Sequence, residues 1–140
     1  MPKKETEIIY YSWSEFSQDI EVLAERIYRV MQEHDLRFDG VFGIPGGGVT
    51  PALCLRHAFN LPLLLAPTPR SLVVDDIADK GESLLHYRSI GCFIATLYYH
   101  PQSIVVPDLW LRQKPEGTEA KEVWIEFPWE RKLLEKLENS

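Results

Sequence analysis

Short apolar runs alternate with amphipathic segments along most of this 140-residue chain. Apolar strands are expected at 39–44, 61–66, 71–76 and 92–99, and helices at 14–34, 49–59 and 81–89. The runs LPLLLA and SLVV lack polar alternation, which is typical of strands buried on both faces. Strands that alternate with helices in this way predict an α/β fold, in which a twisted parallel sheet carries helices on both faces.

Weaker signals lie near the two ends of the chain. Ser12-Trp13-Ser14-Glu15 has the S-x-x-E form of a capping box, which predicts that a helix begins there. After Pro101 only short segments are expected, near 104–111 and 122–127, before a charged helix at 129–138. At this length, residues 1–140 are expected to form a single domain.

An acidic loop follows the predicted strand 71–76. Asp75, Asp76 and Asp79 place three carboxylates within five residues, and adjacent carboxylates repel unless a cation or hydroxyl groups offset their charge. Hydrated Mg²⁺ and the hydroxyls of a sugar both meet that need. Lys80-Gly81-Glu82-Ser83 then begins a helix, where free backbone N–H groups, a lysine and a hydroxyl suit a phosphate. The alternative is a solvated acidic turn in which Asp79 or Ser83 caps the helix.

A glycine-rich loop, Pro45-Gly46-Gly47-Gly48, connects the predicted strand 39–44 to the helix 49–59. Glycine lets a backbone come close to an anion, and the helix that follows adds a favourable dipole. A tight turn from strand to helix is the alternative interpretation. Because ligands of open parallel sheets bind beyond the carboxyl ends of the strands, we expect a binding cleft at this loop and at residues 75–83.

The segment 72–83 resembles the phosphoribosyl-pyrophosphate motif of the type I phosphoribosyltransferases, in which a strand, two acidic residues and an Asp-Thr-Gly-x-Thr-like loop follow one another. Further segments occur in the order shown by the short purine enzymes of the xanthine-guanine and hypoxanthine kind, namely Tyr11-Ser12-Trp13, 96–101, Pro107-Asp108 and 124–130. The string Trp-Ile-x-x-Pro-Trp-acidic at 124–130 is specific to that subgroup. The resemblance covers nearly the whole chain.

The resemblance implies an enzyme that, with Mg²⁺, transfers a 5-phosphoribosyl group from phosphoribosyl pyrophosphate (PRPP) to a 6-oxopurine and releases pyrophosphate. By position, Asp75 and Asp76 hold the ribose hydroxyls and the metal. Asp79 is the expected general base, because a carboxylate that faces purine N7 can accept its proton. The ribose and its phosphate are expected to contact Asp75, Asp76, Asp79, Lys80, Gly81, Glu82 and Ser83.

The same resemblance assigns the pyrophosphate to Pro45, Gly46, Gly47 and Gly48, and the purine to His100, Trp124 and Ile125. Trp124 would stack on the purine ring, and the backbone at Ile125 would contact the ring edge. His100 stands where the subgroup has a lysine that bonds the 6-oxo group. A core over about 10–100, a base-binding hood segment over about 101–130 and a homo-oligomer (dimer or tetramer) are also expected.

Four departures from the family pattern concern the catalytic machinery. Gly46 replaces a basic residue of the pyrophosphate loop, Lys80 replaces a threonine of the phosphate loop, and His100 replaces the lysine. Family enzymes also carry a long hairpin that closes over the reacting centre, whereas only residues 67–70 separate LPLLLA from SLVVDD here. Ligand binding is therefore expected to be better preserved than chemistry.

Composition limits the partners and the compartment. The formal net charge of −6 gives no bulk attraction to nucleic acid or to anionic lipid. No stretch approaches the roughly 20 apolar residues that span a bilayer, and no secretory signal precedes the first helix. Cys54 and Cys92 lie in apolar runs, which favours buried thiols in a reducing, cytoplasmic setting over a disulfide or a zinc site.

Two other functions stay open at this point. One is a catalytically impaired nucleotide- or PRPP-binding regulatory protein on the same fold. The other is a sugar-phosphate-binding protein with an unrelated, flavodoxin-like sheet, in which the tryptophans of 124–130 would lie far from the Asp75 loop.

Overall fold

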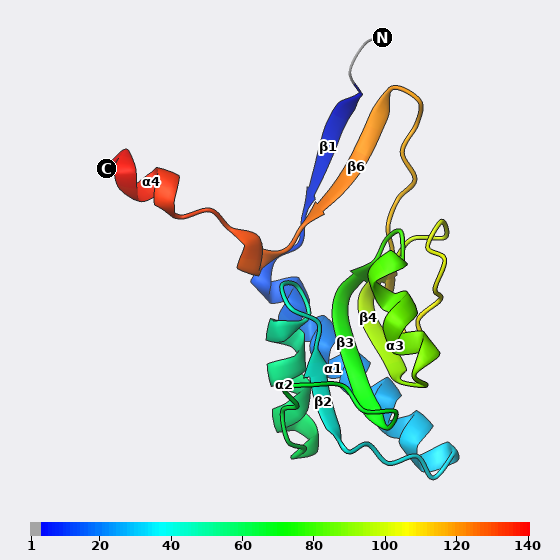
Figure 1. The fold of residues 1–140 in the computed structure, drawn as a ribbon. Helices are drawn as coiled ribbons and strands as arrows, with labels where there is room; N and C mark the ends of the chain where they lie inside the picture. The colour runs from blue at the N-terminus through cyan, green and yellow to red at the C-terminus, as the bar shows by residue number, and fades with distance from the viewer. Residues whose placement is uncertain (1–3) are drawn as a thin grey trace.

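The main sheet has four parallel strands, in the order β2 (Gly40–Gly43), β3 (Ser71–Ala78), β4 (Phe93–Tyr99) and β5 (Arg112–Gln113). Figure 1 labels the first three of these strands side by side. The computed structural model describes residues 4–140. Its strands are β1 (Glu5–Tyr10), β2 (Gly40–Gly43), β3 (Ser71–Ala78), β4 (Phe93–Tyr99), β5 (Arg112–Gln113) and β6 (Lys121–Glu126). Its helices are α1 (Trp13–Glu33), α2 (Val49–Phe59), α3 (Leu85–Ser89) and α4 (Leu134–Glu138), with 3-10 turns at Glu82–Leu84 and Pro128–Glu130.

Two apolar clusters cover the two faces of this sheet. Leu72 and Val74 of β3 contribute to a cluster that also holds Leu23 of α1 and Leu55 of α2. Val73 points to the opposite face, into a cluster that includes Leu84 and Ile94. Side chains alternate along a strand, so a run that is apolar at every position needs helices on both sides. The predicted α/β class with a parallel sheet is confirmed.

The long first helix begins as its sequence predicts. Ser12 is the N-cap, and its hydroxyl oxygen accepts a hydrogen bond of 3.0 Å from the backbone N–H of Glu15. The buried residues Phe16, Leu23 and Ile27 recur at helical spacing on the face that packs against the sheet.

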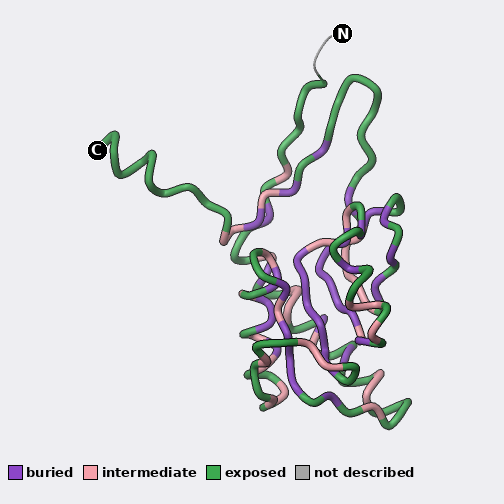
Figure 2. The backbone as a smooth tube through the Cα atoms, in the orientation of Figure 1, coloured by how far each residue is buried: buried purple, intermediate pink, exposed green. Residues whose placement is uncertain are grey.

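The first and last strands form a separate parallel pair, which we call the hood sheet. β1 pairs with β6 over six residues, from Glu5 beside Lys121 to Tyr10 beside Glu126. β1 was not predicted, because its only clear pattern is a short apolar run next to charged residues. The hood sheet projects away from the main sheet, and most of its outer part is exposed (Figures 1 and 2).

Three predicted elements need correction. The strand predicted at 61–66 is wrong: only an isolated bridge between Val41 and Leu63 forms there, and Leu65 is 97% exposed. The predicted helix 81–89 begins as the 3-10 turn Glu82–Leu84, so α3 covers only its second half. The predicted helix 129–138 is shortened to α4, whose leucines stay exposed because no other element packs on them. Within residues 4–140, no helix has the length and apolar character that a bilayer span requires.

Candidate active site

The acidic loop lies at the carboxyl end of β3, in the middle of the main sheet. Asp75 and Asp76 are both buried, and each carboxylate accepts one backbone hydrogen bond: Asp75 from the N–H of Asp76 at 2.9 Å, and Asp76 from the N–H of Ile77 at 2.7 Å. Burial, then the charge of Asp76, raises the pKa of Asp75 to about 8, and burial also raises the pKa of Asp76. This pair is poised to take up a cation or hydroxyl donors.

Magnesium fits this pair only together with a ligand. Mg²⁺ prefers oxygen donors and commonly uses one or two carboxylates plus the phosphate oxygens of a substrate. Asp75 and Asp76 supply such oxygens, whereas residues 4–140 contain no group of three or more acidic, histidine or cysteine side chains that could hold a metal alone.

The glycine loop packs directly on the acidic pair. A β-carbon added to Gly47 would collide with the carboxylate of Asp76, and one added to Gly48 would collide with the carbonyl oxygen of Val74. Gly46 has a φ of +99° and open space around it, and Pro45 is exposed. The loop therefore comes as close to β3 as its lack of side chains permits.

The segment after the pair forms an open turn. Gly81 adopts a φ of +84°, and a side chain there would collide with Ser103. Lys80, Glu82 and Ser83 are exposed at the start of the 3-10 turn. Of the predicted phosphate contacts in this turn, these three residues are accessible, whereas Gly81 is buried.

A cavity of about 220 Å³ lies between the end of β3 and the hood sheet, and we call it the Trp124 cavity. Its walls are Asp76, Ile77, Asp79, Lys114, Trp124, Ile125, Phe127 and Glu130. Trp124 is 51% exposed, whereas Ile125 and Phe127 are buried. Trp124 and Phe127 therefore lie beside the acidic loop. The alternative of a sugar-phosphate-binding protein with a flavodoxin-like sheet, which expected these residues far from Asp75, is wrong.

Glu130 adds a further carboxylate to this cavity. Burial, followed by the charges of Asp76 and Glu126, raises the pKa of Glu130. The cavity therefore combines an acidic wall with an aromatic wall.

His100 is not among the residues that line this cavity. Its Nδ1 is 3.8 Å from Asp79 Oδ1 and has no hydrogen-bond partner in the described part of the chain. His100 instead lines a second hollow of about 460 Å³, the lysine cavity, with Lys4, Lys80, Lys114 and Lys121. The two cavities share Asp79 and Lys114.

Lys114 was missed by the sequence analysis. Its ammonium donates a hydrogen bond of 2.9 Å to Asp79 Oδ2, and its side chain is only 10% exposed. No local pattern marks this lysine, because it reaches the site through the pairing of β5 with β4, a contact between segments that are not adjacent in sequence.

Arg112, two residues earlier, was missed for the same reason. It donates hydrogen bonds of 2.6 and 3.3 Å to the carboxylate of Asp19 on α1, and that carboxylate also accepts one of 2.6 Å from the Tyr11 hydroxyl. These contacts attach β5, and with it the strand end that carries Lys114, to α1.

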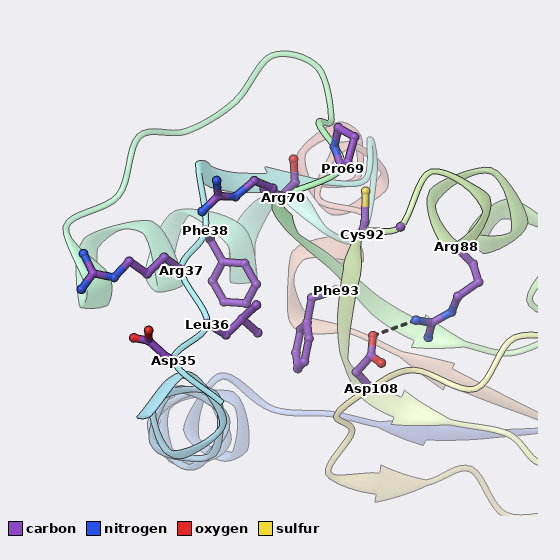
Figure 3. Close-up of a pocket in the computed structure, with 12 residues that line it drawn as sticks. Asp35, Leu36, Arg37, Phe38, Pro69, Arg70, Arg88, Cys92, Phe93 and Asp108 are labelled. Atoms are coloured by element: carbon purple, nitrogen blue, oxygen red, sulfur yellow. Dashed lines mark hydrogen bonds and ion pairs between the residues drawn. The ribbon is translucent and has the colours of Figure 1, made fainter. Parts of the chain in front are cut away.

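A further hollow lies at the opposite end of the main sheet, where the strands begin (Figure 3). Phe38 and Phe93 form its inner wall, with ring centroids 5.5 Å apart. Arg88 at its edge donates a hydrogen bond of 2.9 Å to Asp108. This hollow shares no residue with either cavity described above.

Searches with the sequence match no family model and no curated protein. Solved structures do match. A purine phosphoribosyltransferase from Pyrococcus horikoshii is 26% identical, with a TM-score of 0.70 over 89% of this chain and 95% of that one. A xanthine-guanine-hypoxanthine phosphoribosyltransferase from Helicobacter pylori is 23% identical, with a TM-score of 0.73 over 96% and 100%. A Neisseria gonorrhoeae protein with bound ppGpp is 18% identical, with a TM-score of 0.64 over 99% and 97%.

The resemblance to the purine type I phosphoribosyltransferases is thus confirmed in three dimensions. The chain has the fold of these transferases, and purine phosphoribosyltransferases are among its structural neighbours.

Proposed function

We propose that this chain, built on the type I phosphoribosyltransferase fold, transfers a phosphoribosyl group from PRPP to a 6-oxopurine. The observation that carries the proposal is the Trp124 cavity, where Asp76 and Asp79 from the end of β3 meet an accessible indole from β6. Carboxylates suit the hydroxyls of a ribose, and the indole offers a π-face to a planar base. The ribose and the base of a nucleotide would therefore each contact a suitable group, and these groups lie next to each other.

In the proposed reaction, purine N9 attacks ribose C1, the bond from C1 to the pyrophosphate oxygen breaks, and pyrophosphate leaves with the electron pair. Positive charge that develops on the ribose is stabilised by the nearby carboxylates of Asp75 and Asp76. Asp79 accepts the proton of N7, a role that its place in the wall of the Trp124 cavity supports.

The glycine loop is proposed to face the pyrophosphate. Gly46 and Gly47 expose backbone without side chains next to Asp76, which favours close approach by an anion. Asp75 and Asp76 would hold Mg²⁺ together with oxygens of PRPP, and the metal would supply positive charge near the pyrophosphate. The turn at Lys80, Gly81, Glu82 and Ser83, in which Gly81 is buried and the other three residues are exposed, would take the 5′-phosphate.

Turnover tests this proposal directly. The protein is incubated with PRPP, Mg²⁺ and hypoxanthine, guanine, xanthine or adenine in turn, and nucleoside monophosphate is separated and quantified. We expect nucleotide from at least one 6-oxopurine and none from an Asp79→Asn variant, in which ligand binding should fall only modestly. The absence of nucleotide from every base would remove the proposed activity.

A nucleotide-binding protein without turnover is the second candidate, because the segment between α2 and β3 forms no hairpin over the site. Closing segments of that kind exclude water and complete catalytic sites. This candidate predicts that calorimetry detects binding of GMP or of ppGpp, the ligand of the Neisseria protein, while the turnover assay stays blank.

A further inference from the structure

The hollow where the strands of the main sheet begin is lined by three arginines and no lysine, and we call it the arginine hollow (Figure 3). Arg37 precedes β2, Arg70 precedes β3, and Arg88 belongs to α3. Figure 3 shows Arg37 and Arg70 on one side of the hollow and Arg88 on the other. Its volume of about 300 Å³ suits a small molecule. A guanidinium presents its donors in a planar fork that matches a carboxylate or a phosphate.

The inner wall of the arginine hollow is apolar. The ring centroids of Phe38 and Phe93 are 5.5 Å apart, and the two ring planes are inclined at 56°. Phe38 is buried and Phe93 is half-buried, and Leu36 and Pro69 extend the apolar lining. Aromatic rings favour edge-to-face or offset contacts with a further ring. A flat apolar body can therefore contact this wall while a charged group attached to it reaches the arginines.

One of the two acidic residues in the lining is already engaged. Asp108 accepts a hydrogen bond of 2.9 Å from Arg88 and another of 2.8 Å from the backbone N–H of Ile94. Arg88 also donates a hydrogen bond of 2.6 Å to the carbonyl oxygen of Val106. These contacts fix one side of the hollow and leave Asp35 as the other acidic residue of the lining.

The guanidinium groups of Arg37 and Arg70 are available to a ligand. Arg37 is exposed and forms no ion pair within residues 4–140. Arg70 Nε is 4.0 Å from Asp39 Oδ1, which is too far for a hydrogen bond, and both side chains are exposed. Exposed pairs of this kind contribute little and are exchanged easily. The lining as a whole has three arginines against two aspartates, so it favours an anion.

The turn that carries Arg70 is held by hydrogen bonds around it. The backbone N–H of Asp39 donates to the carbonyl oxygen of Arg70 at 2.9 Å, and the Thr68 hydroxyl donates to the Asp39 carboxylate at 2.9 Å. The buried thiol of Cys92 donates to the carbonyl oxygen of Thr68 at 3.1 Å. Residues 67–70 form the short connection before β3, and the proposed function gives them no role. A backbone that is ordered in advance lowers the cost of binding a ligand at Arg70.

We propose that the arginine hollow binds a small organic acid, in which a carboxylate is attached to a flat apolar ring system. The carboxylate pairs with Arg70 and Arg37, and the ring packs against Phe38 and Phe93. The arginine hollow shares no residue with the Trp124 cavity or the lysine cavity. The inference therefore goes beyond the proposed function and does not depend on it.

Three small compounds test the chemistry of the site. The probe is 2-naphthoate, and its control is 2-naphthamide, which has the same ring and nearly the same shape but no charge. Acetate supplies the charge without the ring. Calorimetry on the full chain measures the three dissociation constants. We expect 2-naphthoate to bind about tenfold more tightly than either control, because only 2-naphthoate makes both the charged and the apolar contacts.

Nuclear magnetic resonance locates the bound probe. We expect 2-naphthoate to shift the backbone amide signals of Phe38, Gly91 and Phe93, which line the arginine hollow. The signals of Gly47 and Trp124, at the opposite end of the main sheet, should stay unchanged.

Arginine variants test the proposed contacts. Arg37→Met and Arg70→Met should each weaken 2-naphthoate about threefold, as expected for one exposed charged contact, and the double variant should weaken it about tenfold. Arg26→Met is the matched control, because Arg26 is an exposed arginine of α1 that does not line the hollow. The binding of 2-naphthoate should be unchanged in this control, and the binding of 2-naphthamide should be unchanged in every variant.

Four results would overturn the proposal: failure of 2-naphthoate to bind, equal binding of 2-naphthoate and 2-naphthamide, unchanged binding of 2-naphthoate in the double variant, or amide shifts confined to Gly47 and Trp124. The last result would place the probe in the candidate active site. Each of them leaves the proposed transfer intact, because the turnover assay with PRPP tests that activity separately.

Discussion

Gly47 lies so close to Asp76 that the space of a single β-carbon at Gly47 is already filled by the Asp76 carboxylate. The contact joins the two loops that lie at the carboxyl ends of β2 and β3. It explains why a glycine is required in this loop: any other residue would push the loop away from the acidic pair.

Gly47→Ala should therefore impair the site more than the fold. We expect the affinity for PRPP to fall at least tenfold, because the loop or Asp76 must move. The stability should fall by about 1–3 kcal/mol, as is usual for overpacking. Calorimetric titration with PRPP and urea unfolding measure the two effects.

Gly91→Ala is the matched control for that variant. Gly91 has a φ of +89° and lies far from Asp76 in open surroundings, so alanine should cost about 1 kcal/mol through backbone strain alone. PRPP affinity unchanged in both variants would show that the glycine loop does not form part of the binding site.

Trp124→Ala should weaken the binding of purine bases by about tenfold or more, because the indole is the accessible aromatic wall of the cavity. Trp124→Phe should recover part of the affinity. Tyr10→Ala is the control, since Tyr10 is an exposed aromatic residue of the same hood sheet that does not line the cavity. Equal losses in the Trp124→Ala and Tyr10→Ala variants would count against stacking.

Asp75 should make the stability of the protein fall as the pH rises. Burial and the neighbouring Asp76 raise its pKa to about 8 in the folded state, whereas an unfolded aspartate titrates near 3.9. The folded form thus binds this proton more tightly. The stability that the proton contributes is complete below about pH 4 and is lost as the pH increases through 8.

Asp75→Asn should remove this dependence. In urea unfolding we expect the variant to match the unaltered protein near pH 4.5 and to exceed its stability by about 1–3 kcal/mol at pH 8.5, the usual range for a single substitution. A difference between the two proteins that stays constant across this range would contradict the assignment.

The helices and strands that were predicted correctly are those whose sequence patterns lie within the element itself. The apolar run before Asp75 predicted a buried strand, and the capping box at Ser12 predicted the start of α1. The run 61–66 has the same apolar character, yet it only touches the outer edge of β2 because no further strand covers it. Hydrophobicity alone does not distinguish the two cases, since the sheet neighbours decide which run becomes a strand.

Contacts between distant segments were beyond the sequence analysis. β1 forms a strand because it pairs with β6, which lies more than 100 residues further along the chain. Lys114 enters the site because β5 pairs with β4, and nothing near Lys114 in the sequence indicates that neighbour. The aspartates, the glycines and Trp124 entered the predicted site because they belong to motifs with a recognisable order, and their roles stay predictions.

The Arg112 and Asp19 side chains should be coupled energetically. In a double-mutant cycle of Arg112→Met and Asp19→Asn, we expect a coupling energy of about 1 kcal/mol, since Arg112 is partly exposed. Additive effects in urea unfolding would contradict a direct interaction.

A crystal structure of the protein soaked with GMP and Mg²⁺ tests the central claim most directly. We expect the guanine ring beside Trp124, the ribose at Asp75 and Asp76, and the phosphate at the turn 80–83. Nucleotide density at any other place, including the hollow between Phe38 and Phe93, would contradict it.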